Sequence, residues 1–527
     1  MTGAPASGGL AEADASWTEE LQEVARRRGI AAELGGGERQ RLQHERGKLF
    51  VRERLDLLLD AESFREVGSI AGRASYDEEG ALREFVPSAL VVGSGAIEGR
   101  PVAVAADDYT IRGGAAEPDA LEKMAYAEQF ANEFQLPLIR LVESSGGSVR
   151  SVEAIGRTYV PLNPAWEWVV ANLATVPVVS VALGACAGIA AARVVSSHYS
   201  VMVAGTAQVF AAGPPLVTQI GEQRTKEELG GVEVHTRNGV VCDAVASEEE
   251  AFERVRRFLS YLPSSCAELP PQRAATDPAE RAEEWLATAI PRNLRKPYAI
   301  RPILEAVVDE GSMLELGRGF GRSVVTALAR LEGRPIALLA SDTHVGAGTM
   351  TAAGARKLES FVDLASTFHL PVVHLVDQPG FAIGLENERA GTMRAGVRAL
   401  SAIHQTDVPW CSVILRRCYG VAGAGHANGA RVQHRFAWPS GTWGSLRLEG
   451  GIQAAYRREI EAAEDPAAAE EAIRRRLASL GSPLRTAEAF WIEEIIDPRE
   501  TRMRLCEFAR LAYRKLSPGP RAWGYRG

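Results

Sequence analysis

Ile97-Glu98-Gly99-Arg100-Pro101 returns almost letter for letter as Leu331-Glu332-Gly333-Arg334-Pro335 in the second half of the chain. Other residues match at the same offset or at a slightly shorter one: Asp108 with Asp342, Gly114 with Gly348, Lys123 with Lys357, Gly146 with Gly380, Ser180 with Ser412, Cys186 with Cys418 and Gly188 with Gly420. A chain made of two such copies is expected to form two domains of one fold. It is also expected to contain two similar sites, which can hold two similar reactive groups.

Each copy alternates strand-like and helix-like segments. The segments expected in the first copy are a hairpin at 89–105, a helix at 119–136, a strand at 137–142 ending in a glycine turn, a helix at 165–173, and a strand at 176–183 ending in another glycine turn. Strand, glycine turn and helix in this repeated order predict an α/β fold with layered domains.

We expect three parts in the chain. Residues 1–16, rich in Ala, Gly and Ser, are predicted to form a disordered tail. Residues 17–270 form the first domain and include a helical arm over 18–59, where Leu recurs among Arg and Glu. Residues 271–527 form the second domain, because the stretch 263–291 between the copies is rich in Pro, Ala and charge.

The composition is typical of a globular protein: 527 residues, 46% hydrophobic and 24% charged. A net charge of −8 argues against a nucleic-acid partner, which would need clustered Lys and Arg. No apolar run approaches the ~18 to 20 residues of a membrane span, and the N-terminus lacks the basic start of a signal peptide. The six cysteines are scattered without a C-x-x-C pair, so we expect reduced thiols and a cytoplasmic location.

Four glycine turns follow predicted strands at matched places in the two copies. They contain Gly146 and Gly380 in one pair, and Gly188 and Gly420 in the other. Where a helix follows such a turn, its first N–H groups lack partners and suit an anion or a developing oxyanion. A single glycine after a strand is most often only a turn, but four at matched places favour a function.

The chain contains no motif that indicates a nucleophile, a metal site or a nucleotide-binding loop. Neither copy has G-x-S-x-G or G-x-x-x-x-G-K-[ST], and no G-x-G-x-x-G opens a helix in a βαβ unit. The nine histidines show no H-x-x-x-H spacing, so no metal site is predicted. The remaining hypothesis is an active site whose hydrogen-bond donors are backbone N–H groups. In such a site the substrates themselves would carry out the proton transfer and the reaction at carbon.

Several motifs resemble those of one family. The stretch 47–60, Gly-Lys-Leu-Phe-Val-Arg-Glu-Arg-Leu-Asp-Leu-Leu-Leu-Asp, is similar to the arm that opens the carboxyltransferase (β) subunit of biotin-dependent acyl-CoA carboxylases, such as the propionyl-CoA and methylcrotonoyl-CoA enzymes. Residues 225–231 with His235 resemble that family's stretch near the acyl-CoA pocket, and 376–381 resembles its second-half signature. The resemblance covers about residues 40–516.

The resemblance implies two crotonase-like domains, each a spiral of ββα units, in a hexamer of two stacked rings. It also implies an active site between the first domain of one subunit and the second domain of a neighbour, where a coenzyme A thioester meets carboxybiotin. This chain has no Met-Lys-Met biotinylation motif. A biotin carrier protein and a biotin carboxylase on separate subunits would therefore supply the biotin.

By the same resemblance, the N–H groups of Gly188 and Ile189 would hold the thioester enolate. Those of Val421 and Ala422, on a turn shaped by Gly420, would hold the ureido oxygen of biotin. The expected substrate-binding residues are Gly146, Gly147, Gly380, Phe381 and Ala424. The implied activity is movement of CO2 from carboxybiotin to the α (or vinylogous) carbon of an acyl-CoA.

Two positions depart from the family pattern. Ala424 stands where members acting on short acyl chains commonly have Asp, and Ile189 stands where a second glycine is common. The acyl group is therefore not predicted. Two alternatives stay open: a malonyl- or methylmalonyl-CoA decarboxylase of the same fold, and a non-catalytic assembly subunit.

Overall fold

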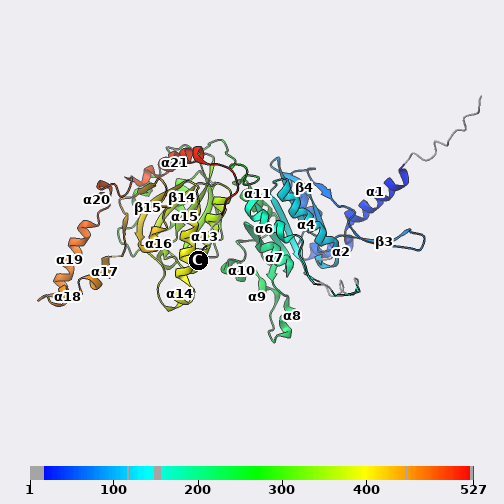
Figure 1. The fold of residues 1–527 in the computed structure, drawn as a ribbon, viewed down its shortest axis with the longest axis horizontal. Helices are drawn as coiled ribbons and strands as arrows, with labels where there is room; N and C mark the ends of the chain where they lie inside the picture. The colour runs from blue at the N-terminus through cyan, green and yellow to red at the C-terminus, as the bar shows by residue number, and fades with distance from the viewer. Residues whose placement is uncertain are drawn as a thin grey trace, which may run out of the picture.

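The computed structural model describes residues 17–115, 118–147, 153, 156–158, 160–446, 448–522 and 526. The predicted tail at 1–16 lies outside them. Figure 1 shows two sheet-centred lobes side by side, one from each half of the chain. The predicted duplicated α/β fold is confirmed.

The first sheet has eight strands in the order β1-β4-β5-β6-β7-β8-β10, with β9 beside β7. Its β1, β4 and β5 are antiparallel, and the pairings from β5 to β10 are parallel. The strands are β1 (Arg65–Val67), β4 (Leu90–Ile97), β5 (Arg100–Asp107), β6 (Leu138–Ser144), β7 (Val178–Ala187), β8 (Tyr199–Val203), β9 (Gln208–Phe210) and β10 (Asp243–Val245).

The second sheet repeats this order as β11-β12-β13-β14-β15-β16-β18, with β17 beside β15. Its strands are β11 (Leu314–Leu316), β12 (Val324–Leu331), β13 (Arg334–Ser341), β14 (Val372–Gln378), β15 (Trp410–Tyr419), β16 (His434–Ala437), β17 (Thr442–Gly444) and β18 (Glu494–Ile495). The register shifts between Val142 and Ser144 in one copy and between Val376 and Gln378 in the other. The repeat therefore extends to a matched irregularity just before a glycine turn.

The repeated Glu-Gly-Arg-Pro motif forms the turn of the β4–β5 and β12–β13 hairpins. Both central residues have positive φ, 51° and 76° at Glu98 and Gly99, as a two-residue hairpin turn requires. The carboxylate of Asp60 accepts both N–H groups of this turn, at 3.0 and 2.8 Å. Asp309 accepts the two equivalent N–H groups in the second copy, at 3.0 and 2.7 Å.

Helices follow the hairpins and the strands in the same order in both copies. They are α4 (Pro118–Glu133), α6 (Trp166–Thr175) and α7 (Ile189–Val195) in the first, and α13 (Ala352–Thr367), α15 (Thr392–Gln405) and α16 (Gly420–Ala424) in the second. α4 contacts β4, β5 and α6, and α13 contacts β12 and α15. Each hairpin and its helix make one ββα unit of a crotonase-like domain.

The predicted arm consists of α1 (Thr18–Glu33), α2 (Gly37–Glu45) and α3 (Val51–Leu58), which is anchored by the buried Leu55 and Leu58. The arm's last helix contacts α11 (Glu248–Leu259). The predicted domain boundary at 270 falls after α11, in a stretch that joins neither sheet.

One apolar core continues from the first domain into the second, because buried side chains such as Phe258 and Phe368 belong to the same cluster. The ring centroids of His198 and Phe368 are 4.9 Å apart across the junction. No helix of the described segments is long and apolar enough to cross a lipid bilayer.

Candidate active site

Two matched turns link a buried central strand to a short helix. Gly188 lies between β7 and α7 with φ 59° and ψ −114°, and Gly420 lies between β15 and the rest of α16 with φ 63°. These angles are unfavourable for any residue with a Cβ. Both turns stand at the carboxyl ends of parallel strands, the edge at which ligands bind in α/β sheets.

The first turn leaves consecutive N–H groups at the start of α7 without an acceptor in the described segments. The N–H of Gly188 donates to the Phe210 carbonyl oxygen at 3.2 Å, and the first intrahelical bond is Ala192 N–H to Gly188 O at 3.0 Å. Within the described part of the chain, the N–H groups of Ile189 and Ala190 have no acceptor. The donor expected at Gly188 is therefore engaged by the protein itself, and the available pair lies one residue further along.

The second turn presents the equivalent pair. No acceptor in the described segments is bonded to the N–H groups of Val421 and Ala422. Val421 is 54% exposed, while Ala422 is buried. A Cβ on Gly420 would lie 3.5 Å from the Ser445 carbonyl oxygen, which is an ordinary van der Waals contact. The positive φ of this residue, and not a lack of space, therefore favours glycine.

The turns at Gly146 and Gly380 lie beside these donors and form what we call the wall of each site. The N–H groups of both glycines are hydrogen-bonded to side chains of the protein. The Gly146 N–H donates to Ser144 Oγ at 3.1 Å, and the Gly380 N–H donates to Gln378 Oε1 at 2.9 Å. A Cβ on Gly146 would be only 2.9 Å from the Ala187 carbonyl oxygen, so the two turns of the first domain touch. Gly147 has open space around it.

Phe381 lies in the equivalent wall of the second domain. Its ring packs so tightly on α15 that a Cβ on Gly396 would be 2.3 Å from it. The Gly380 carbonyl accepts the N–H of Met350 at 3.0 Å, which ties this wall to the segment before α13. Gly146, Gly380 and Phe381 therefore lie in turns beside the donor turns, and the N–H groups at 146 and 380 are bonded within the protein.

A buried carboxylate sits behind each wall. Glu143 is fully buried and accepts Lys48 Nζ at 2.6 Å and Arg54 Nη2 at 2.9 Å. Asp377 accepts the guanidinium groups of Arg416 at 2.9 Å and Arg417 at 2.5 Å. Burial acts to raise the pKa of Glu143, but Arg54 and Lys48 outweigh it and hold the pKa below its usual value. The Glu143 carboxylate thus remains charged, and the ion pairs of Glu143 and Asp377 fix the turns.

The side chains beneath the turns are poor nucleophiles and bases. Burial raises the pKa of the Cys418 thiol to about 12 and also raises that of Cys186. Burial lowers the pKa of His374 to about 3 and lowers that of His426, whose Nδ1 is 2.9 Å from the Gly423 carbonyl oxygen. No group of three His, Cys, Asp or Glu in the described residues could hold a metal ion. The chemistry these turns offer is hydrogen-bond donation.

Ala424 lines a cavity of about 260 Å³ beside the second turn, together with Gly420 and Cys418. Trp443 and Trp491 complete its apolar wall, and Trp491 is 76% exposed. The two tryptophans were not predicted, because they lie in later segments that carry no motif. The small side chain at 424 leaves this space open.

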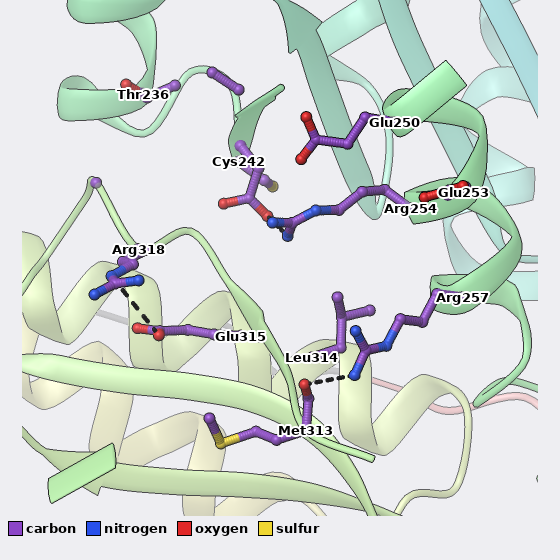
Figure 2. A pocket seen from close by; sticks show the side chains of 13 residues that line it. Thr236, Cys242, Glu250, Glu253, Arg254, Arg257, Met313, Leu314, Glu315 and Arg318 are labelled. Carbon is purple, nitrogen blue, oxygen red and sulfur yellow. Dashed lines mark hydrogen bonds and ion pairs between the residues drawn. The ribbon is translucent and has the colours of Figure 1, made fainter. Parts of the chain in front are cut away.

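A larger cavity, of about 630 Å³, lies between the domains and not at the turns. Figure 2 shows that α11 supplies Arg254 and Arg257 on one side, while Glu315 and Arg318 lie on the other. Arg257 donates to the Met313 carbonyl at 2.8 Å. None of the predicted site residues lines this cavity. Two ion pairs lie within its lining, Arg254 with Asp243 and Arg318 with Glu315.

Known proteins share both the sequence and the fold. A family model described as the carboxyl transferase domain matches residues 42–522. The propionyl-CoA carboxylase carboxyltransferase subunit of Haloferax mediterranei is 32% identical over 513 residues, 95% of this chain and 98% of that protein. The methylmalonyl-CoA carboxyltransferase 12S subunit of Propionibacterium freudenreichii is 30% identical over 519 residues, 95% of each.

A transcarboxylase 12S crystal structure, described as a hexamer assembly with methylmalonyl-CoA and methylmalonic acid bound, matches the fold closely. The TM-score is 0.88 at 28% identity, covering 98% of this chain and 100% of the other. With the family model spanning nearly all of the described fold, the chain belongs to the carboxyl transferase domain family.

Proposed function

We propose that this protein is the carboxyltransferase component of a biotin-dependent acyl-CoA carboxylase. The observation that carries the proposal concerns the N–H groups of Ile189 and Ala190 at one turn and of Val421 and Ala422 at the other. None of them has an acceptor in the segments that the structure describes. Carboxyl transfer between two carriers needs this arrangement, because negative charge develops on an oxygen of each carrier.

The first turn would act on the acyl-CoA. When the α-proton leaves, the thioester oxygen becomes an enolate oxygen, and two N–H groups at a helix start stabilise that charge. One such donor typically contributes about 3 kcal/mol to the transition state. Gly188 holds the direction of the pair, and the wall at Gly146 fixes the turn from behind.

The second turn would bind the ureido oxygen of biotin. Its donor pair suits that oxygen in the same way, because negative charge would develop on the oxygen as CO2 leaves carboxybiotin. When bound, carboxybiotin supplies CO2 and a ureido nitrogen that can accept the substrate proton. The chain's part is to hold both oxygens, to keep the reactants close and to exclude water.

The partners follow from the chemistry and the relatives. The biotin group would come from separate biotin carrier and biotin carboxylase subunits. The two turns stand on different lobes (Figure 1), so we propose that subunits assemble, as a hexamer, to bring the first turn of one against the second turn of another. The protein would act in the cytoplasm.

The test is a transfer assay with the full assembly. Purified protein, its biotin-bearing subunits, ATP, bicarbonate and a panel of acyl-CoAs are incubated, and mass spectrometry follows the carboxylated thioester. Formation of that product supports the proposal. CO2 release from malonyl- or methylmalonyl-CoA without biotin would identify a decarboxylase instead, and absence of both activities would leave an assembly subunit.

A further inference from the structure

His426 lies two residues beyond α16, the short helix that carries the second donor pair. Its backbone N–H donates to the Gly423 carbonyl oxygen at 3.0 Å, and its ring Nδ1 lies 2.9 Å from the same oxygen. Because a carbonyl oxygen only accepts, Nδ1 carries the proton and donates it. One histidine therefore makes two hydrogen bonds to a single carbonyl group of this helix.

The other ring nitrogen of His426 is unpaired. With the proton on Nδ1, Nε2 is an acceptor, and it is buried without a hydrogen-bond partner in the segments that the structure describes. The ring lines a cavity of about 20 Å³ with Leu400, Ile403 and Phe381, and burial lowers the pKa of His426, so the ring is neutral at pH 7. An unpaired buried nitrogen is unfavourable. The polar contact that this ring placement provides is the bond from Nδ1 to Gly423.

The main chain of His426 is fixed to two central strands of the second sheet. Its carbonyl oxygen accepts Trp410 Nε1 at 2.7 Å and Ser412 Oγ at 2.6 Å, both from β15. His374 Nδ1, on β14, lies 3.4 Å from the same oxygen. All three of these side chains are buried. His426 therefore connects the sheet to the end of α16.

The first copy holds its equivalent helix in another way. Because Gly188 aligns with Gly420, the residue equivalent to His426 is Val194. α7 has seven residues and includes Val194, whereas α16 has five and ends before His426. Backbone bonds continue through the last turn of α7, where the N–H of Ser196 donates to the Ala192 carbonyl at 3.0 Å. In the second copy a side chain supplies the bond that a longer helix provides in the first.

The position of α16 sets the direction of the N–H groups of Val421 and Ala422. A helix of five residues has few internal hydrogen bonds to hold its direction. Gly423 follows the donors directly and packs closely on the end of β15, because a Cβ there would be 2.8 Å from the Cys418 carbonyl carbon. The bonds from His426 to the Gly423 carbonyl thus act one residue from the donor pair.

We propose that His426 is a positioning residue for the second donor turn, an inference that rests on the proposed function. Its Nδ1–H group holds Gly423, and through it directs the N–H groups of Val421 and Ala422 at the ureido oxygen of biotin. His426 acts through the helix. Its Nε2 is buried and takes no proton from a substrate.

Three substitutions separate the roles of the two ring nitrogens. His426→Asn keeps a donor near the place of Nδ1 and removes Nε2. His426→Gln places its amide group near Nε2 instead, and His426→Leu has no donor. His198→Gln is the control, because His198 is bonded to Val178 and Leu173 of the first domain and, within the described chain, to neither donor turn.

The transfer assay is run from malonyl-CoA or methylmalonyl-CoA to free biotin, so that each turn has its own substrate. In this direction the carboxyl group leaves the α-carbon for a ureido nitrogen, and the proton of that nitrogen goes to the α-carbon. Biotin-dependent product formation gives kcat/KM for biotin and KM for the thioester, per folded protein. Hydrogen–deuterium exchange with mass spectrometry measures the backbone amides of 420–425 in the same samples.

We expect His426→Gln and His426→Leu to lower kcat/KM for biotin about tenfold or more, because a displacement of about 1 Å can cost ~100-fold. Amide exchange at 420–425 should be faster in both variants, while the KM for the thioester stays unchanged. His426→Asn should remain close to the wild type in each measurement. His198→Gln should lower stability and leave kcat/KM for biotin unchanged.

Equal losses in His426→Asn and His426→Gln would overturn the inference, as would wild-type kcat/KM in His426→Gln and His426→Leu. A loss of the same size in His198→Gln would also overturn it, because general destabilisation would then explain the effect. If His426→Leu does not fold, the comparison of Asn with Gln carries the test. If the wild type passes no carboxyl group to biotin, the proposed function fails, while amide exchange still tests whether His426 holds α16.

Discussion

The main-chain N–H of Gly188 donates to the carbonyl oxygen of Phe210, 3.2 Å away. The bond extends the pairing of β7 with β9 by one residue beyond Ala187 and Phe210. Gly188 therefore contributes its conformation, φ 59° and ψ −114°, and not its N–H, to the first turn. A Cβ there would meet nothing closer than the Ala211 carbonyl oxygen at 4.0 Å, so backbone strain alone opposes a side chain.

Gly188→Ala should consequently lower both stability and activity. We expect a loss of about 1–3 kcal/mol in the free energy of unfolding, and a lower kcat because the donors at 189 and 190 turn away. Urea unfolding and the transfer assay measure the two effects. Gly37→Ala is the control: it opens α2, has free space around it and should be neutral or slightly stabilising. Wild-type behaviour of Gly188→Ala would contradict this role.

The donor at Ile189 can be removed without disturbing the helix. Proline is favoured at the first helical position, so Ile189→Pro deletes one N–H and keeps α7. We expect kcat to fall about 10²–10³-fold. Ile189→Ala keeps the N–H and removes the side chain, and its kcat should stay within a few-fold of wild type. Equal activity in both variants would remove Ile189 from the proposed mechanism.

Sequence alone predicts the duplicated fold, because the Glu-Gly-Arg-Pro turns fix two hairpins and the glycine turns fix the strand ends. It does not predict the partner of Gly188. Phe210 belongs to a three-residue strand, β9, that carries no motif and joins the sheet by parallel pairing. The repeat nevertheless indicates the same donors in the first copy. Because Gly188 aligns with Gly420, the residues equivalent to Val421 and Ala422 are Ile189 and Ala190.

The arm illustrates a different limit. Its helices follow from the spacing of Leu among Arg and Glu, and Leu55 and Leu58 are buried as that spacing requires. Arg39 and Arg46 of α2 line a cavity of about 250 Å³ together with Arg112, which lies in the loop after β5. Only the packing of the arm on the first domain brings them together, so no local pattern reveals them.

The ion pairs of Glu143 predict a pH dependence. Its pKa in the folded state lies below its ordinary value of 4.5, so it stabilises the fold above that pH and the contribution is lost as the pH falls further. Glu143→Gln should cost about 3–5 kcal/mol at pH 7, because Lys48 and Arg54 lose a buried partner. The difference from wild type should shrink below pH 4.5, as urea unfolding at several pH values would show.

An exposed carboxylate gives the comparison for that experiment. Glu45 pairs with Arg41 on the surface of α2, and Glu45→Gln should change the unfolding free energy by less than about 1 kcal/mol. A Glu143→Gln loss as small as this would mean that the buried carboxylate does not fix the turn.

His198 should make the protein less stable in mild acid. Its Nδ1 accepts the Val178 N–H at 3.0 Å and its Nε2 lies 3.0 Å from the Leu173 carbonyl, which fixes the neutral ring. Burial lowers its pKa to about 4. Between pH 6.5 and 4 the unfolded chain binds a proton at His198 that the folded chain does not, so the contribution of His198 to stability falls by about 1.4 kcal/mol for each unit that the pH is lowered.

His198→Gln should reduce the slope of stability against pH over that interval by about this amount, while the buried His374 still contributes its own slope. The stability of the variant at pH 7 should be lower. The exposed His404→Gln variant should keep the wild-type slope. Urea unfolding at half-unit steps of pH measures the unfolding free energy of both variants against pH. If the slope of His198→Gln equals that of the wild type, another group causes the acid sensitivity.

Ala424 should control the size of the acyl group if the cavity beside the second turn receives it. That cavity holds about 260 Å³ and is bounded by Trp443 and Trp491. Ala424→Leu fills part of it, and one excess methylene in an apolar pocket already costs about 1–3 kcal/mol. We expect kcat/KM for longer acyl-CoAs to fall at least tenfold relative to acetyl-CoA, while Ala424→Gly should shift the ratio the other way. Equal selectivity in wild type and both variants would show that the acyl chain lies elsewhere, and that the two tryptophans serve a different surface of the assembly.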